Sequence, residues 1–230
     1  MTGRVAVVTG GSGALGQSVV LRFLHDGGSV AVPWIVPEEW ETLRTRAGDG
    51  AARLHGARVD GTNEGAFAAF VADVLARHQR LDVLVNTVGG FAGGDLASTS
   101  LAEWRRMLDL NLTSAVIGCR AVLPAMRAAR RGRIVNVASR AVVPPLGGFI
   151  AYTVSKSAVI ALTQALAQEE RPHGISVNAV LPSTMDTPAN RRDMPDADRS
   201  GWVSTDAVAD VIAYLVSDVA GAVSGATVAV

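Results

Sequence analysis

Cysteine, aromatic residues, excess charge and long apolar runs are all scarce or absent in this sequence of 230 residues. The single cysteine, Cys119, excludes an intramolecular disulfide and any cysteine-based zinc site, which fits a reducing cytoplasm. Basic and acidic residues number 21 each, so no net field attracts nucleic acid or an anionic membrane. No apolar run approaches membrane-spanning length, no signal-peptide region precedes Val5, and the four histidines lack metal-ligand spacing. We therefore expect a cytoplasmic protein that binds no nucleic acid, membrane or metal.

Small apolar residues are plentiful, and they predict the fold class. Hydrophobic residues make up 49% of the chain and 24 residues are glycine, so the core must be built largely from Ala, Val and Leu. Short β-branched runs alternate with longer helical segments, which indicates an α/β, doubly wound (Rossmann-type) seven-stranded parallel sheet with helices on both faces. At this length we expect a single domain over residues 1–230. The predicted strands are Val5–Thr9, Ser29–Val32, Arg53–Ala57, Leu81–Asn86, Arg133–Ala138, Ser176–Leu181 and Ala226–Val230.

Two long helices and one long loop complete the predicted organisation. Ser100, followed three residues later by Glu103, predicts a capping box that opens a helix ending near Arg130, where Gly132 stops it. A second long helix is expected over residues 149–171. The irregular stretch from residue 182 to residue 203 is longer than most loops in compact domains, so we expect a substrate lid at about residues 183–203.

A glycine-rich turn, TGGSGALG, follows the first strand at residues 9–16 and leads into a helical segment. Strand, glycine turn and helix N-terminus in this order present free backbone amides and the positive end of the helix dipole to a pyrophosphate. We therefore predict that this turn binds a dinucleotide, NAD or NADP. The residues expected to contact it are Gly10, Ser12, Ala14, Leu15 and Gly16.

The charged residue that usually selects between NAD and NADP is missing from the end of the second strand. Trp34 stands there, where it would border the adenine side of the cofactor, and Glu38 and Glu39 come a turn late. The preference is therefore not readable from the sequence. We expect NADH and NADPH to differ by only about tenfold.

Tyr152 and Lys156 are four residues apart in a helical segment, so both side chains leave the same face. A phenol has a reference pKa of about 10 and exchanges protons at neutral pH only when a nearby cation stabilises the phenolate. Lys156 is such a cation. The pair is a candidate acid/base device for a proton on an alcohol or carbonyl oxygen.

Together with Asn86, Asn111 and Ser139, these motifs resemble the short-chain dehydrogenase/reductase family over essentially the whole chain. Ser139 precedes Tyr152 by thirteen residues, as that family's catalytic serine does. The resemblance implies an NAD(P)-dependent oxidoreductase that interconverts a small-molecule carbonyl and alcohol, or reduces a conjugated heterocycle. It also implies a homodimer or homotetramer.

The resemblance further implies a role for each matching residue. Tyr152 would donate and accept the proton, and Lys156 would lower its pKa and hold the nicotinamide ribose. Ser139 would polarise the reacting oxygen, and Asn111 would hold a water that passes the proton towards solvent. The other implied cofactor contacts are Asp60 and Asn86, with Pro182, Thr184 and Thr187 near the nicotinamide amide.

Some features depart from the general family pattern. The family's middle glycine in the turn is Ala14 here, and the segments VGGFAGG and LPSTMDT are similar to the dihydropteridine reductase branch. That branch, however, lacks the serine supplied by Ser139 and carries an acidic residue where Trp34 stands. A 3-oxoacyl reductase and a quinonoid dihydropteridine reductase remain alternatives. A non-catalytic dinucleotide-binding sensor or scaffold is the alternative of another class, and the intact catalytic set argues against it.

Apolar residues predict a substrate class and a subunit contact. Both long helices carry more apolar residues than one sheet face needs, among them Met107, Val116, Val159 and Leu166, so we expect them to pair with their copies in a second subunit. The substrate walls favour a hydrophobic or heterocyclic ketone over a sugar. The expected wall residues are Phe91, Val142, Val143, Pro144, Leu146, Phe149, Met185 and Trp202.

Overall fold

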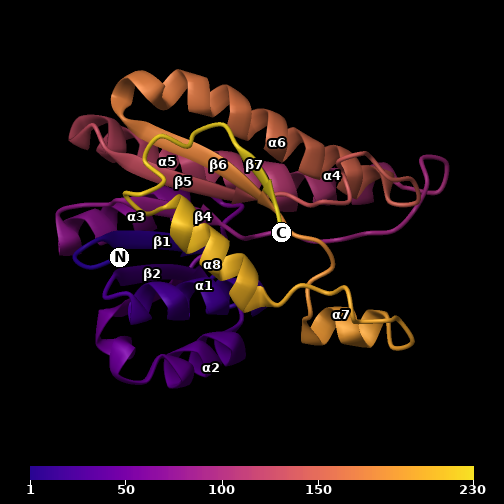
Figure 1. The fold of residues 1–230 in the computed structure, drawn as a ribbon, viewed down its shortest axis with the longest axis horizontal. Helices are drawn as coiled ribbons and strands as arrows, with labels where there is room; N and C mark the ends of the chain where they lie inside the picture. Colours follow the sequence, from indigo (N-terminus) through magenta and orange to yellow (C-terminus); the bar gives the residue numbers. More distant parts are fainter.

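The computed structural model describes residues 1–230 and contains one seven-stranded parallel sheet of order β3-β2-β1-β4-β5-β6-β7 (Figure 1). Strand order reverses between β1 and β4, and ligands in such sheets bind beyond the carboxyl ends of the strands at this switch point. The predicted fold class is confirmed, with strand boundaries shifted by up to two residues. The strands are β1 (Val5–Thr9), β2 (Ser29–Trp34), β3 (Leu54–Arg58), β4 (Val83–Asn86), β5 (Gly132–Val137), β6 (Ile175–Leu181) and β7 (Thr227–Ala229).

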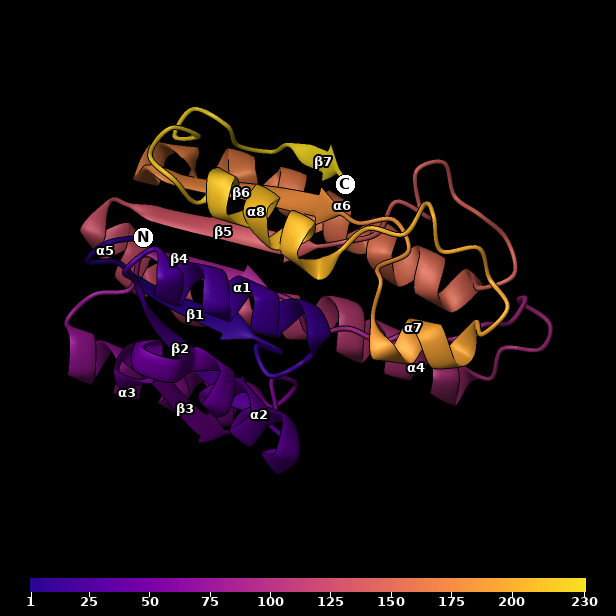
Figure 2. The ribbon, with the colours of Figure 1, turned by 60° about the horizontal axis from the view of Figure 1, so that its bottom comes forward.

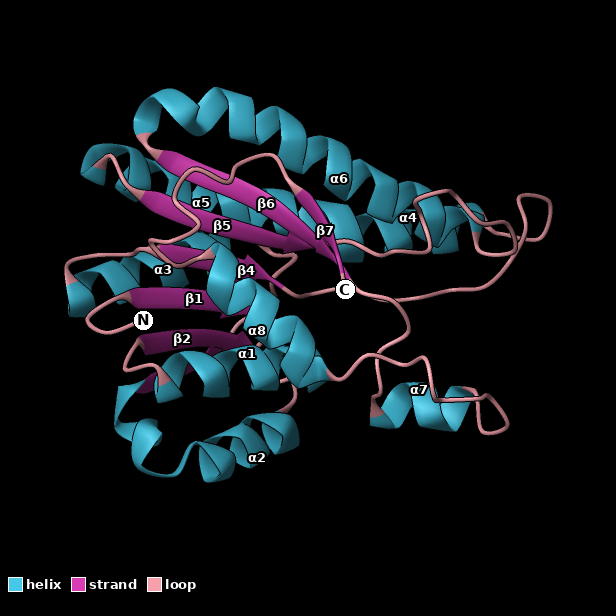
Figure 3. Ribbon diagram, in the orientation of Figure 1, coloured by secondary structure: helices cyan, strands magenta, loops and turns pink.

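Helices cover both faces of the sheet (Figure 3). Alternate residues of each strand point to opposite faces, so Ala6 and Val8 join one core cluster while Val5 and Val7 join the other. The first cluster is completed by α1 (Ala14–His25), α2 (Pro37–Ala47) and α8 (Thr205–Leu215), and the second by α3 (Glu64–His78), α5 (Ser114–Ala129) and α6 (Ile150–Glu170). The remaining helices are α4 (Leu101–Leu108), α7 (Pro188–Asp193) and 3₁₀ turns at Gly48–Arg53 and Arg171–His173.

The helix predicted to run from Ser100 to Arg130 is interrupted by a π-helical turn, Asp109–Thr113, which joins α4 to α5. Ser100 Oγ accepts a hydrogen bond from Glu103 N at 3.1 Å, as one half of a capping box requires. The Glu103 carboxylate pairs with Arg106 instead of completing the box. The prediction that Gly132 stops the helix is wrong. The stop is Arg130, in the left-handed conformation with φ +50°, and Gly132 begins β5.

The residues predicted to contact a second subunit lie mostly inside the chain. Met107, Val159 and Leu166 are buried in the core and Val116 is partly buried, so the prediction is wrong for the first three. The stretch from Ile150 to His173 is long and apolar enough to cross a membrane, and less than half of it is buried within the chain. Core helices of soluble proteins share this property, and α6 lies along β6 (Figure 1).

The loops that follow β4, β5 and β6 gather beyond the carboxyl ends of the strands, together with α7 (Figure 2). The segment after β6 leaves the sheet and returns at a paired stem. There Asp186 N donates to Val203 O at 2.8 Å and Val203 N donates to Thr184 O at 3.0 Å. Helix α7 therefore lies within a long loop, the excursion at residues 183–203, whose two ends are held together by this stem. The excursion lies at the end of the molecule where the predicted site residues also lie.

Candidate active site

The glycine turn packs too closely against its surroundings to accept side chains at three of its glycines, Gly10, Gly11 and Gly16. A Cβ on Gly10, which has φ +62°, would lie 2.9 Å from Thr87 Oγ1, and a Cβ on Gly16 would lie 2.1 Å from Gly10 O. The cap of α1, Gly13, has no side chain to satisfy the first-turn amides, and no acidic residue occupies that turn. These amides are free to bind an anion at the positive end of the helix dipole, so the turn fits the pyrophosphate of a dinucleotide.

Ala14 replaces the glycine that the family has in this turn. It is the first residue of α1 and is exposed, so its methyl group is not pressed against the backbone of the turn. Leu15 and Ser12 are buried beside it, at 6% and 4% exposure. The three residues that follow Gly10 in the predicted contact set therefore lie together at the N-terminus of α1.

Ser139 and Tyr152 meet beyond the end of β5. Ser139 is nearly buried and its Oγ accepts a hydrogen bond from Ala141 N at 3.2 Å, which fixes the hydroxyl at the start of the loop. Burial raises the pKa of Tyr152 above its ordinary value, and a side-chain hydrogen bond with Ser139 lowers it in part. The phenol is consequently protonated at neutral pH and can act as an acid.

Lys156 lies one turn of α6 beyond Tyr152 and is the only lysine among the 21 basic residues of the chain. Its side chain is 5% exposed, and Nζ donates to Val137 O at 2.8 Å, at the end of β5. Burial lowers its pKa from 10.5 to about 8. The two shifts in pKa of Tyr152 and Lys156 have the same origin, because burial disfavours the charged form of each group.

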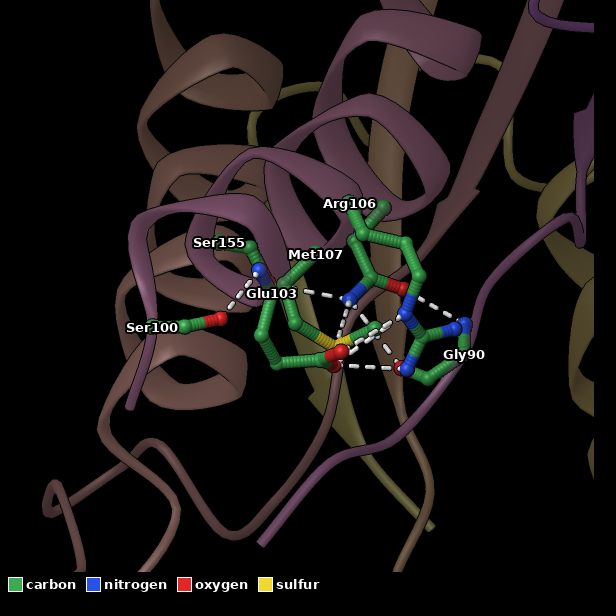
Figure 4. A network of polar contacts seen from close by, with 7 residues as sticks. Gly90, Ser100, Glu103, Arg106, Met107 and Ser155 are labelled. Atoms are coloured by element: carbon green, nitrogen blue, oxygen red, sulfur yellow. Dashed lines mark hydrogen bonds and ion pairs between the residues drawn. The ribbon is translucent and has the colours of Figure 1, made fainter. Parts of the chain in front are cut away.

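Asn111 ties the π turn to the loop at Gly90 and to helix α6. Its Oδ1 accepts from Gly90 N at 2.9 Å, and its Nδ2 donates to Gly90 O at 3.1 Å and to Ser155 Oγ at 2.9 Å. These two partners, Gly90 and Ser155, are labelled in Figure 4 together with Met107, whose sulfur lies 3.8 Å from Asn111 Nδ2. Ser155 Oγ in turn donates to Tyr152 O at 2.8 Å. The amide of Asn111 is therefore used to hold the site together.

The π-helical turn at Asp109–Thr113 supports a functional role for this part of the chain. Such turns replace the i→i+4 hydrogen bonds of an α-helix locally by i→i+5 bonds, and they occur frequently at functional sites. The turn surrounds Asn111, which is 1% exposed. Sequence reasoning identified Asn111 but missed its partners Ser155 and Gly90. The only signal for Ser155 was its position, three residues after Tyr152 and directly before Lys156.

Asn86 ends β4, at the edge of the sheet where the cofactor is expected. Its side chain is 4% exposed and faces the interior, where Nδ2 donates to Asn136 Oδ1 at 2.8 Å. Asn136 Nδ2 continues the chain of bonds to Thr163 Oγ1 at 2.9 Å. Thr9, Asn86 and Asn136 are register partners on adjacent strands, which explains why they meet. A contact between Asn86 and a cofactor would have to use its backbone, not its amide side chain.

The other predicted cofactor residues border the same edge of the sheet. Asp60 follows β3, and its Oδ1 accepts from Thr62 N at 2.8 Å, so it caps a turn and keeps its second oxygen free. Thr187 Oγ1 accepts from Asn190 N at 3.1 Å and caps α7. Pro182 is buried just after β6, and Thr184 belongs to the paired stem of the excursion.

Other features of the molecule do not compete for the chemistry. A cavity of about 730 Å³ lies away from this site, beside the residues that precede β1, where Arg4 pairs with Asp218 and Arg22 with Asp210. Its charges are thus already neutralised in pairs. No group of three His, Cys, Asp or Glu side chains is arranged to hold a metal ion. Burial raises the pKa of the Cys119 thiol to about 12, so this cysteine is unreactive at neutral pH.

The fold and these side chains define a dinucleotide-dependent oxidoreductase. A family model described as short chain dehydrogenase matches residues 4–198. A 3-alpha-(or 20-beta)-hydroxysteroid dehydrogenase from Mycobacterium bovis is 33% identical over 242 residues, covering 98% of this chain and 87% of that protein. The chain therefore belongs to the short-chain dehydrogenase/reductase family.

Solved structures agree with this assignment. NAD⁺-bound xylitol dehydrogenase is 25% identical with a TM-score of 0.92, covering 100% of this chain and 98% of that one. A variant of actinorhodin polyketide ketoreductase with NADPH is 29% identical with a TM-score of 0.92, covering 99% of this chain and 95% of that one. The protein is an enzyme of this family, and its cofactor is NAD or NADP.

Proposed function

We propose that the enzyme is cytoplasmic and interconverts a carbonyl and an alcohol on a small apolar substrate, with Tyr152 as general acid and base. One observation supports this most strongly. Tyr152, Ser139 and the buried Lys156 lie together at the carboxyl end of β5, where the Ser139 side chain lowers the pKa of the phenol in part and Lys156 Nζ donates to Val137 O. A sensor or scaffold that only binds a dinucleotide has no use for this arrangement.

In the proposed reduction, bound nicotinamide supplies the hydride. Tyr152 gives its phenolic proton to the carbonyl oxygen, and Ser139 donates a hydrogen bond to the same oxygen as negative charge develops on it. Lys156 stabilises the phenolate that remains and holds ribose hydroxyls. Asn111, in the π turn, keeps the loop at Gly90 and helix α6 in register, and a water beside it would return the proton from solvent.

The cofactor-binding residues follow from the same proposal. The first-turn amides of α1 and the glycine turn would hold the pyrophosphate, and Asp60 would contact the adenine. The backbone at Asn86 would border the ribose. Pro182, Thr184 and Thr187, which begin the excursion after β6, would receive the nicotinamide amide.

The substrate surface beside Tyr152 is aromatic. The Phe91 ring lies edge-on to Tyr152 at 5.0 Å between centroids, and Phe149 lies 5.6 Å from Phe91. Phe91 is 62% exposed. Val143 and Leu146, which follow Ser139 closely in the sequence, are each more than half exposed. Large apolar side chains left in water beside a reactive group typically mark a binding surface. A cyclic or aromatic ketone fits these walls better than a sugar.

One predicted wall residue is buried and offers no free face, because Val142 is only 3% exposed. Met185 packs against the core cluster that contains α1 and α8 and is partly exposed. Among the similar proteins, the names of the hydroxysteroid dehydrogenase and the polyketide ketoreductase fit ring-containing substrates, whereas xylitol is a polyol. The proposal therefore depends on the aromatic side chains of this chain.

The aromatic surface gives a direct test. We expect cyclic or aromatic ketones to have kcat/KM values at least about tenfold above those of sugar ketones, and Phe91→Ala to lower kcat/KM for the apolar ketones by about tenfold, chiefly through KM, because one phenyl contact is lost. The assay follows NAD(P)H absorbance with a carbonyl panel. Val219→Ala, at an 84% exposed apolar residue after α8, is the control. A preference for sugars, unchanged by Phe91→Ala, would reject the substrate class.

The excursion at residues 183–203 is proposed as the substrate lid of a single domain. Its paired stem at Thr184 and Val203 anchors both ends, and Arg191 pairs with Asp186 next to the stem. Such an anchored loop can move as a unit over the site while the sheet remains fixed.

We also propose a homodimer or homotetramer that uses the uncovered side of α6. Val154 on α6 is 39% exposed, and more than half of this apolar helix is not buried within one chain. We expect sedimentation at micromolar concentration to give a dimer or larger species, and Val154→Glu to shift it towards monomer. Val219→Glu should leave the species unchanged. A wild-type monomer under these conditions would contradict the proposal.

A further inference from the structure

One carboxylate reaches the glycine turn from outside it. We infer that Glu39 selects NAD(H) over NADP(H), by accepting hydrogen bonds from the adenosine ribose and repelling a 2′-phosphate. The inference rests on the proposed binding of the dinucleotide at the turn and adds to it the residue that discriminates. Glu39 belongs to the first turn of α2, five residues beyond Trp34, the position where the usual selector is missing.

The contact is direct. Ser12 Oγ, in the turn, donates to Glu39 Oε2 at 3.2 Å. Ser12 is 4% exposed, whereas Glu39 is exposed, so the carboxylate covers the turn and keeps lone pairs directed to solvent. Although Glu39 stands five residues after Trp34 in the sequence, its side chain therefore reaches the turn. Glu38 makes no side-chain hydrogen bond or ion pair with the turn.

Tryptophan packing explains why α2 brings Glu39 to this place. Trp34, at the end of β2, stacks on Trp40 at 6.0 Å with planes 8° apart. Trp40 lies over β3 at Gly56, where a Cβ would come within 2.3 Å of the indole ring. Because Trp40 is buried and directly follows Glu39, the first turn of α2 has little freedom to rotate the carboxylate away. Only glycine at residue 56 allows this approach.

A second connection ties α2 to the same serine. Arg46 Nη1, in the last turn of α2, donates to Gln17 Oε1 at 2.7 Å, and Gln17 Nε2 donates to Ser12 O at 2.7 Å. The helix is thus bound to the glycine turn at both of its ends, once through the Ser12 side chain and once through its carbonyl. A carboxylate held in this way loses little entropy when it receives ribose hydroxyls.

The electrostatics favour the unphosphorylated ribose. A 2′-phosphate brings about two negative charges at neutral pH, and close to a fixed carboxylate these repel, whereas ribose hydroxyls can donate to the same oxygens. Two cations stand nearby, because Arg46 reaches the turn through Gln17 and Arg58 is the register partner of Trp34 at the end of β3. Neither guanidinium makes a direct hydrogen bond or ion pair with the turn. Among these three charged side chains, only Glu39 hydrogen-bonds the turn directly.

Calorimetry with NAD⁺ and NADP⁺ tests the inference without any substrate. The expectation of only about a tenfold difference assumed that no charged selector is present, and Glu39 changes it. We expect the wild type to bind NAD⁺ at least about thirtyfold more tightly than NADP⁺, and Glu39→Gln to reduce this ratio at least about tenfold, since the amide keeps the contact with Ser12 but removes the charge. Glu38→Gln is the matched control, with the same charge change in the same helical turn, and should leave the ratio unchanged. The fragments 5′-AMP and adenosine 2′,5′-bisphosphate should show the same difference.

Failure of the inference about Glu39 and failure of the proposed function would give different experimental results. If both dinucleotides bind but Glu39→Gln leaves their ratio within twofold, or Glu38→Gln changes it equally, Glu39 is not the selector and the proposed function stands. A wild type that prefers NADP⁺ and loses that preference in Arg58→Gln would make Arg58 the selector instead. A folded chain that binds neither dinucleotide would overturn both the selector and the proposed function.

Discussion

Replacing Tyr152 by Phe is expected to lower kcat by about 10²–10⁴-fold, the usual contribution of one positioned acid or base. The substitution removes only the phenolic oxygen, and the ring keeps its packing against Phe91 and Phe149. Dissociation constants for the dinucleotide should therefore stay within about threefold, because the loss falls on a proton transferred in the transition state.

The chain offers a close control for this experiment. Tyr214 is the only other tyrosine, and it lies half exposed on α8. Tyr214→Phe should leave kcat and KM unchanged. Single-turnover kinetics and calorimetry on both variants separate chemistry from cofactor binding. If Tyr152→Phe retains most of its kcat, the acid/base assignment is wrong even though the fold and family remain.

The fold could be predicted from the sequence because the hydrophobic pattern of each element agrees with its place in the folded chain. In a parallel sheet covered on both faces, strands carry runs such as Val83 to Val85 that are apolar on both sides, and this sets them apart from the longer helical segments. The boundaries were less readable. β2 continues through Pro33 to Trp34 because it keeps pairing with β3, which only the register shows.

The site was readable only in part, because some contacts depend on the register and on packing between elements. Asn86 faces inward since its neighbour in the next strand is Asn136, a fact that no local sequence pattern contains. Glu39 reaches Ser12 because Trp34 and Trp40, which are distant from the turn in the sequence, stack on each other and hold α2 in place. Sequence spacing located the acid/base pair but not the interactions that orient it.

Lys156 is the point at which function and stability conflict. Its ammonium is held almost without solvent at the end of β5, with one hydrogen bond to Val137 O. A pKa lowered from 10.5 to about 8 means that the fold disfavours the charged form. The shift corresponds to about 3 kcal/mol at neutral pH. The enzyme retains this cost because a fixed cation beside the phenol is required for the proposed chemistry.

Lys156→Met is therefore expected to be inactive and more stable. At pH 7 we expect a gain of about 2 kcal/mol, the desolvation cost less about 1 kcal/mol for the lost hydrogen bond. For a domain of this size that corresponds to a rise in Tm of about 4–8 °C, at fixed protein concentration. Dinucleotide binding should weaken in the same variant, because the ammonium is assigned to the ribose. Lys156→Arg keeps the charge and should show no gain in stability.

The pH dependence gives the sign of the effect. Below about pH 8 Lys156 is protonated in both the folded and the unfolded chain, so the wild type carries the full cost of the buried charge. Between about pH 8 and pH 10.5 the unfolded chain binds more protons than the folded one, so wild-type stability rises relative to the variant and the advantage of Lys156→Met shrinks. Urea unfolding of both proteins at pH 7 and pH 10 measures this difference. Because Lys156 is the only lysine, selectively labelled protein gives a single lysine side-chain NMR signal, from which the pKa is read directly. A midpoint near 10.5, or a variant that is less stable than wild type at pH 7, would show that the ammonium is not desolvated.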